Sequence, residues 1–164
     1  MNLQKILNRL QKLHPKEIDL SLERIKKLCK KLGYPQNKLK CISVIGTNGK
    51  YSTIQAMRSI LNKANIKCNI YTSPHIQKIN ERFIFNNKEI SNDILAKLLI
   101  EVEEINQGEP ITYFEILTAA YFYYAKNFDN INLIESGLFH RFDATNIIKE
   151  NLASIITTIG LDHL

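Results

Sequence analysis

The stretch that decides the fold reads CISVIGTNGKYST and covers residues 41–53. Its first five residues form a short apolar run rich in β-branched side chains, which predicts a strand that ends at Gly46. Residues 49–64 then show the apolar spacing of a helix, and residues 67–71 form a second strand-like run. The side chains expected to face inward from this helix are Ile54, Met57, Ile60 and Leu61. The order strand, helix, strand requires a right-handed crossover and therefore predicts a parallel sheet.

The remaining chain supplies further helices and strands in alternation. Helices are expected over 3–13, from a cap at Ser21 to Gly33, over 92–106 after a cap at Ser91, and over 113–126. Strands are expected over 131–135 and 153–158, and a small hairpin over 82–85 and 89–90 around Asn86-Asn87. We therefore expect one α/β domain with an open, mostly parallel sheet and flanking helices, whose ligands bind at the carboxyl ends of the strands.

Length and composition exclude several classes of protein. The 164 residues suffice for one domain, and 45% hydrophobic with 23% charged residues is the balance of a globular rather than a disordered chain. No apolar run is long enough for a membrane span and no secretory signal is present, so a cytoplasmic protein without a membrane partner is expected. Cys29, Cys41 and Cys68 lack CxxC spacing and are interpreted as packed thiols, not as disulfides or zinc ligands.

The basic excess of the chain is confined to its first part. Residues 1–40 hold 11 Lys and Arg against 3 Asp and Glu, whereas the rest is slightly acidic. The densest run, Lys26 to Lys31, contains no aromatic side chain on which a base could stack, and on a helix such a run is usually a solvated face. A nucleic-acid partner is therefore not expected.

The turn after the first strand suits a phosphate. It reads Gly46-Thr47-Asn48-Gly49-Lys50-Tyr51-Ser52-Thr53 and leads into a helix, whose free N–H groups and dipole favour an anion. Lys50 can supply a point charge to the β and γ phosphates. The pattern is not a complete P-loop, because Val44 stands where a glycine is needed and Tyr51 follows the lysine in place of Ser or Thr. The alternative is a strand-to-helix turn whose glycines serve geometry only.

Polar residues also follow the other predicted parallel strands. Thr72-Ser73-Pro74-His75 follows the second strand, Glu135 closes the strand 131–135, and Gly160-Leu161-Asp162-His163 follows the last strand. A hydroxyl, a carboxylate and an imidazole that converge beside bound phosphates can form a hard-cation site. The alternatives are a simple turn for Ser73-Pro74, a surface carboxylate for Glu135 and a terminal side chain for His163.

Seven short motifs occur in order along nearly the whole chain. They are Ile18-Asp19-Leu20, Gly46-Thr47-Asn48-Gly49-Lys50, Thr72-Ser73-Pro74-His75, Asn80-Glu81-Arg82, Thr112-Tyr113-Phe114-Glu115, Asp143-Ala144-Thr145-Asn146 and Gly160-Leu161-Asp162-His163. Together they resemble the amino-terminal ATPase domain of folylpolyglutamate synthase. That family includes the bifunctional dihydrofolate synthases and belongs to the Mur ligase superfamily, so the resemblance implies the P-loop-like central domain of a Mur ligase.

The resemblance implies an ATP-dependent ligase that adds L-glutamate to a folate or dihydropteroate. A substrate carboxylate attacks the γ-phosphate to give an acyl phosphate, and the glutamate amine then displaces phosphate. Lys50 takes the catalytic role, and the residues implied for ATP are Thr47, Asn48, Gly49, Lys50 and Ser52. Those implied for Mg²⁺ are Ser73, Glu135 and His163. Those implied for the folate or pteroate pocket are Ile18, Asp19, Leu20, Thr112, Tyr113, Phe114, Glu115, Arg141 and Asp143. No obligate protein partner is expected.

The chain departs from the family in side chains and in length. Tyr51 and Phe139-His140 stand where the family has glycines, so Tyr51 is expected to crowd the phosphates and Phe139 the pocket. Ser136 replaces an apolar residue. Because the family continues well past His163, we expect residues 1–164 to be a truncated, single, incomplete ATP-binding domain with a helical segment over 1–40 and without the carboxyl-terminal ligase domain. The alternative is a non-catalytic nucleotide-binding remnant or a decaying gene fragment. A P-loop kinase or GTPase is disfavoured by the incomplete motif.

Overall fold

The computed structural model describes residues 2–13, 20–137 and 141–160, and its centre is one six-stranded sheet. The strand order is β4-β3-β2-β5-β1-β6. Four strands are parallel, and β3 and β4 extend the β2 edge as antiparallel neighbours. The strand bounds are β1 Lys40–Ile45, β2 Cys68–Tyr71, β3 Phe83–Phe85, β4 Lys88–Glu89, β5 Ile131–Glu135 and β6 Asn151–Ile156. The predicted open, mostly parallel α/β sheet is therefore confirmed.

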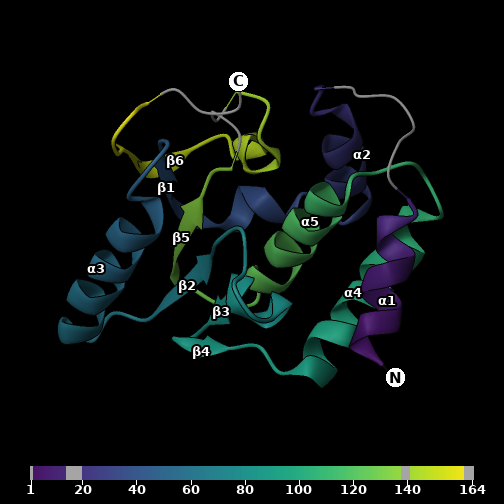
Figure 1. Cartoon of the computed structure of the whole chain (residues 1–164), viewed down its shortest axis with the longest axis horizontal. Coiled ribbons are helices and arrows are strands. Elements are labelled where there is room, and N and C mark those ends of the chain that lie inside the picture. Colours follow the sequence, from purple (N-terminus) through teal and green to yellow (C-terminus); the bar gives the residue numbers. More distant parts are fainter. Residues whose placement is uncertain (1, 14–19, 138–140, 161–164) are drawn as a thin grey trace.

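Helices cover both faces of the sheet (Figure 1). Helix α3 lies alone on one face, and α5 lies on the other with α4, α1 and α2 packed around it. The helix bounds are α1 Leu3–Gln11, α2 Glu23–Lys31, α3 Lys50–Lys63, α4 Asn92–Asn106 and α5 Tyr113–Ala125, with 3-10 turns η1 Pro35–Lys38, η2 Ile79–Arg82 and η3 Ala144–Ile147. No helix of the described ranges is long and apolar enough to cross a membrane.

The two faces bury cores of unequal size. On the α5 side, side chains from the first two helices, α4, α5 and the sheet form one continuous cluster, in which the Tyr71 and Tyr121 rings lie 4.8 Å apart. On the α3 side, Ile54 packs against a smaller group from the strands. The helices before β1 thus pack into the same core as the sheet. This explains why these basic helices have apolar side chains at helical spacing along one face.

Local capping residues explain where several elements begin and turn. Ser91 Oγ accepts a hydrogen bond from the Ile94 N–H at the start of α4, as predicted. Asn86 and Asn87 both have positive φ, which two-residue hairpin turns require, so the predicted β3–β4 hairpin is confirmed.

The structure corrects three expectations from the sequence, two about the bounds of elements and one about the burial of a side chain. Helix α2 begins at Glu23, and its N-cap residue is Leu22 and not Ser21. Ile60 is 68% exposed, since α3 is the one helix on its face and its outer side meets solvent. Strand β6 begins two residues earlier than expected and ends two residues earlier.

The three cysteines are free and buried, as the sequence analysis expected. Burial raises the pKa of both Cys29 and Cys41 to about 12. These thiols are therefore protonated at neutral pH and pack as small apolar groups.

Candidate functional site

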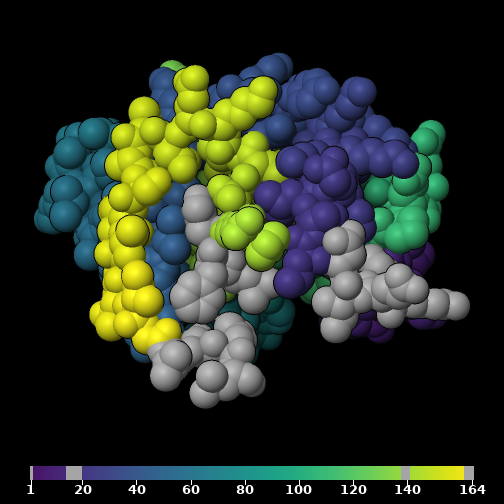
Figure 2. All heavy atoms as spheres, turned by 90° about the horizontal axis from the view of Figure 1, so that it is seen from above, coloured from purple at the N-terminus to yellow at the C-terminus, as the bar shows by residue number. Residues whose placement is uncertain are grey.

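The loop after β1 is held against the segment that follows β6. Gly46 has φ +142°, and a Cβ placed there would lie 2.1 Å from Thr157 Oγ1. The N–H groups of Thr47 and Asn48 donate to the Thr158 carbonyl at 2.9 and 3.4 Å. Two of the N–H groups expected to face a phosphate are therefore already used. In the view from above, the yellow C-terminal segment lies along one side of the molecule (Figure 2).

Free donors remain at the start of α3. Gly49 precedes the helix with φ +84°, and the N–H of Thr53 donates to the Gly49 carbonyl at 2.9 Å, closing the first turn. The N–H groups of Lys50, Tyr51 and Ser52 lie within that turn, where a helix offers no acceptor of its own. An anion at this point is stabilised by those groups and by the helix dipole.

Lys50 is the first residue of α3, and its largely buried side chain reaches back to the loop. Its Nζ donates to the carbonyls of Gly46 at 2.8 Å and Thr47 at 3.2 Å. It lies 4.0 Å from Glu135 Oε1, at the carboxyl end of the neighbouring strand β5. Two of the three N–H donors of the Lys50 ammonium are used in these hydrogen bonds, which leaves the third for a phosphate. Tyr51, next along the helix, is 56% exposed, and the expectation that its ring crowds bound phosphates stays a prediction.

Glu135 joins Lys50 to the turn after β2. Its Oε2 accepts the Ser73 N–H at 3.1 Å, and its side chain is buried. Burial raises the pKa of Glu135, while the Ser73 N–H, Lys50 and Arg82 act against that rise and Asp143 adds to it. The cost of burying this carboxylate is thus offset only in part by its neighbours, and carboxyl groups with shifted pKa values are common at sites where a cation or substrate is bound.

We predict that Glu135→Gln increases the free energy of unfolding near neutral pH. A raised folded-state pKa means that the unfolded state ionises first, so stability is lost as the pH rises through the ordinary value of 4.5 toward the raised value. The neutral amide avoids this loss, and its gain should disappear below pH 4.5. Urea unfolding across pH 4–8 measures the effect, with the exposed Glu104→Gln on α4 as control. A gain that is independent of pH would contradict the assignment.

A second group of side chains gathers where β5 ends. The Gly137 N–H donates to Asp143 Oδ2 at 2.6 Å, and a Cβ at Gly137 would lie 3.6 Å from Ser73 Oγ and 3.9 Å from Phe114 Cζ. Asp143 is 1% exposed and also accepts the Thr145 N–H at 2.9 Å. The structure therefore brings Phe114 and Asp143 together beside Ser73, which places part of the predicted pocket next to the phosphate loop.

The other residues predicted for that pocket do not lie together in one place. Thr112 and Glu115 form a capping box at the start of α5, and Glu115 Oε2 also binds Arg24 Nε at 3.0 Å. Both side chains therefore hold α5 and α2 together. Tyr113 lines a separate groove between α1 and η2. Leu20 and Arg141 are exposed, and Ile18 and Asp19 lie outside the described residues.

The predicted metal ligands are brought together only in part. The backbone N–H of Ser73 binds the Glu135 carboxylate, which holds the two residues side by side, and hydroxyl and carboxylate oxygens are the ligands that Mg²⁺ prefers. His163 lies outside the described residues, as do Phe139 and His140. Within the described ranges no group of three His, Cys, Asp or Glu side chains could hold a metal ion. The donors present suit a hard cation that takes its other ligands from phosphate and water.

Sequence reasoning missed Thr157, Thr158 and Gly137. The pair Thr157-Thr158 follows the last apolar strand directly, which is the signal that could have placed it beside Gly46. Asn80-Glu81-Arg82 was noticed as a motif without a role, and in the structure it shapes the turn that carries Ser73. Glu81 accepts the N–H groups of the three residues 76–78, at 2.8–3.0 Å.

Comparisons with known proteins point to one family. The chain is 40% identical over 152 residues to the dihydrofolate synthase/folylpolyglutamate synthase of Bacillus subtilis, covering 87% of this chain and 35% of that protein. The enzyme of the same name from Escherichia coli is 35% identical over 159 residues, covering 96% of this chain and 37% of that protein. The chain thus spans a little over a third of the length of these relatives. No family model matches it.

Solved structures agree with the sequence comparison. E. coli FolC in complex with DHPP and ADP superposes with a TM-score of 0.91 at 33% identity, over 99% of this chain and 39% of that one. A bifunctional folylpolyglutamate synthase/dihydrofolate synthase with Mn, AMPPNP and L-glutamate bound gives a TM-score of 0.90 at 31% identity, over 100% of this chain and 40% of that one. By sequence and by fold, the chain belongs to the folylpolyglutamate synthase/dihydrofolate synthase family.

Proposed function

We propose that this chain is the ATP-binding part of a ligase that joins L-glutamate to a folate or dihydropteroate. The observation that carries the proposal is the contact set at three neighbouring strand ends, where Lys50 faces Glu135 and Glu135 binds the Ser73 N–H. The names of the relatives, and ADP, AMPPNP and Mn in the solved structures, support the same ligands. We treat residues 1–164 as one ATP-binding unit to which residues 1–40 add a helical segment.

The residues present fit a nucleotide with Mg²⁺. Phosphates at the start of α3 meet the backbone donors of Lys50, Tyr51 and Ser52 and the Lys50 ammonium. Glu135 and Ser73 would hold Mg²⁺ with His163, and the ion would supply charge neutralisation at the transferring phosphoryl group. Thr47 and Asn48 belong to the loop itself, and their hydrogen bonds to Thr158 restrict its movement.

The proposed reaction has two steps. A substrate carboxylate oxygen attacks the γ-phosphorus while the bond to the β-phosphate oxygen breaks, and ADP leaves with the electron pair. The amine of glutamate then attacks the acyl carbon, phosphate leaves and the amine loses a proton. Lys50 stabilises the charge that develops on the phosphoryl group. Phe114 and Asp143 are proposed to form part of the folate or pteroate pocket, because they lie beside Ser73.

A titration with Mg-ATP, Mg-ADP and AMP tests nucleotide binding. The proposal predicts that affinity falls in that order, because the loop contacts the β and γ phosphates. The N–H groups of Thr47 and Asn48 already bind the Thr158 carbonyl, so the nucleotide is expected to bind weakly. The alternative of a nucleotide-binding remnant predicts weak binding too. Equal affinity for AMP and ATP, or no binding, would reject the phosphate assignment.

We predict that a polypeptide of these 164 residues does not transfer glutamate by itself. Amide formation requires the amine within about 3 to 3.5 Å of the activated carbonyl, and such placement can contribute roughly 7–11 kcal/mol. The matched region is 35–40% of the relatives, and the rest of the ligase is proposed to supply that placement. Incorporation of labelled glutamate, measured beside a full-length relative, checks this. Turnover that survives repurification and is lost in Lys50→Ala would overturn it.

A further inference from the structure

Arg82 is a buried cation that the reaction outlined above does not use. It ends η2, and its carbonyl accepts the Thr72 N–H at 3.3 Å, so its backbone is fixed beside the turn that carries Ser73. The residue is 9% exposed. Its charge is therefore held in the protein interior, next to the site.

The guanidinium has few partners for a group in this position. Its Nε donates to His75 Nδ1 at 3.0 Å, and this is the one side-chain hydrogen bond that Arg82 makes to the described residues. Within the same ranges no carboxylate oxygen lies within 4.0 Å of it, whereas Arg9 and Arg24 each bind a glutamate. An arginine offers five N–H donors, and a buried charge without a counter-ion is strongly unfavourable.

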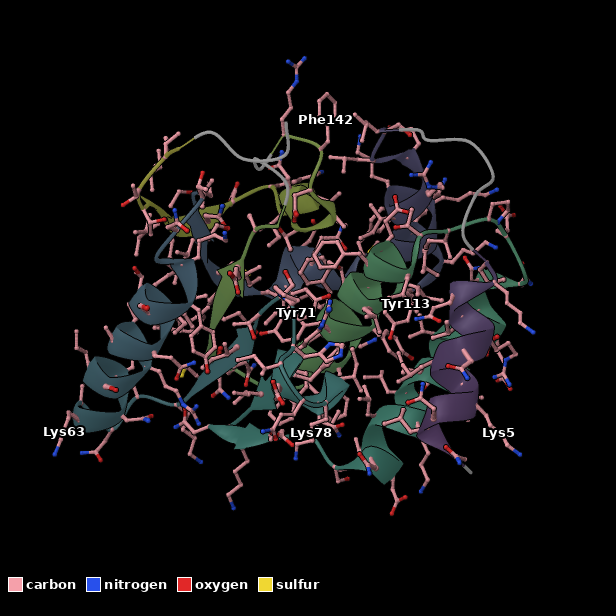
Figure 3. All side chains as sticks on the ribbon, in the orientation of Figure 1. Lys5, Lys63, Tyr71, Lys78, Tyr113 and Phe142 are labelled. Carbon is pink, nitrogen blue, oxygen red and sulfur yellow. The ribbon has the colours of Figure 1, made fainter. Side chains whose placement is uncertain are left out.

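Arg82 lies against the turn after β2 that carries Ser73. Its backbone carbonyl binds the N–H of Thr72, and its side chain binds His75, so it contacts the turn on both sides of Ser73. Its charge lowers the pKa of Tyr113 and of Tyr71 against the rise that burial causes. Figure 3 labels these two tyrosines, Tyr71 from β2 and Tyr113 from α5. Lys50 lies 4.0 Å from Glu135, which accepts the Ser73 N–H, and Arg82 contacts the same turn at Thr72 and His75, so both cations adjoin one segment of the chain.

We propose that Arg82 binds the carboxylate of the acyl substrate and places it for attack on the phosphoryl group held at Lys50. The inference rests on the proposed function. A planar carboxylate can accept two parallel N–H bonds from a guanidinium, which fixes its orientation as well as its position. Two anions must approach each other in this reaction, and a cation on each of them reduces their repulsion. The bond to His75 occupies only Nε and keeps the fork in one orientation.

Dihydropteroate and its carboxamide are the probes that test this role. Their affinities are measured by calorimetry in the presence of Mg-ADP, for the parent chain, Arg82→Gln and the control Arg58→Gln. Arg58 lies on α3 and donates to the Asn87 carbonyl at 2.8 Å, away from the site. We expect the parent and Arg58→Gln to bind the acid at least about tenfold more tightly than the amide. Arg82→Gln should lose that preference and keep its affinity for Mg-ADP.

Each other result contradicts the inference or its premise. If the parent shows no acid preference, or Arg82→Gln retains it, Arg82 does not bind the carboxylate. Weaker Mg-ADP binding in Arg82→Gln would assign the cation to a phosphate. Urea unfolding distinguishes a role in binding from a role in stability. Removal of a buried charge that has no counter-ion among the described residues should leave Arg82→Gln at least as stable as the parent chain. An Arg82→Gln chain that fails to fold overturns the inference. Absence of Mg-ADP binding in the parent refutes the proposed function instead.

Discussion

Gly46→Ala is expected to destabilise the chain by more than about 3 kcal/mol, a large part of the 5–15 kcal/mol that holds a typical domain folded. The added Cβ would lie 2.1 Å from Thr157 Oγ1 and 3.2 Å from the Thr158 carbonyl oxygen. The backbone at Gly46 also has φ +142°, a region that side chains rarely adopt. Either β6 moves away from the loop, or the loop leaves its position.

A matched control separates the contact from the backbone conformation. Gly33 has φ +79°, and a Cβ there meets nothing within 4 Å, so Gly33→Ala reports the backbone effect alone. We expect it to cost about 1 kcal/mol. Urea unfolding of both variants makes the comparison. A Gly46→Ala chain that unfolds at the same urea concentration as Gly33→Ala would show that the loop does not depend on its close contact with Thr157.

Lys50→Ala is expected to weaken Mg-ATP binding at least 30-fold, about 2 kcal/mol. The lysine is held at the loop by two carbonyls and lies beside Glu135, so its removal takes positive charge from the point where phosphates are proposed to bind. It also leaves the Glu135 carboxylate without that cation, which makes an approaching phosphate less favourable still.

Lys63→Ala is the control for this variant. Lys63 lies in the last turn of the same helix α3, so the two changes alter the net charge equally (Figure 3). Only Lys50 is close to the loop. We expect Mg-ATP affinity to be unchanged in Lys63→Ala. An equal loss in both variants would mean that net charge, and not the position of Lys50, controls the binding.

The sheet could be predicted from sequence because its strands are nearly continuous apolar runs. Strand β5 was predicted with its observed bounds, since Ile131 and Glu135 delimit a run buried on both faces. The position of β6 was less certain, because its residues are mostly exposed and leave a weak pattern. Ile60 was misplaced for a related reason, since spacing alone does not tell how much of α3 the sheet covers.

The candidate site could be predicted only at the ends of strands. Ser73 follows β2, Lys50 follows the loop after β1 and Glu135 ends β5, and parallel strands bring such positions to one edge. Contacts between distant segments were not predictable. The pairing of Glu115 with Arg24 depends on how α5 meets α2, and the burial of Arg82 depends on how η2 folds against β2. Neither of these contacts between segments can be predicted from the spacing of residues along the sequence.

The most direct test of the phosphate loop is the position at which the nucleotide binds. Backbone amide NMR of the 164-residue chain during titration with Mg-AMPPNP follows each residue separately. The account predicts saturable shifts that are largest at residues 49–52 and that also reach Ser73 and Glu135, with the far end of α3 unchanged. Saturable shifts confined to another surface, with residues 46–52 unaffected, would contradict it.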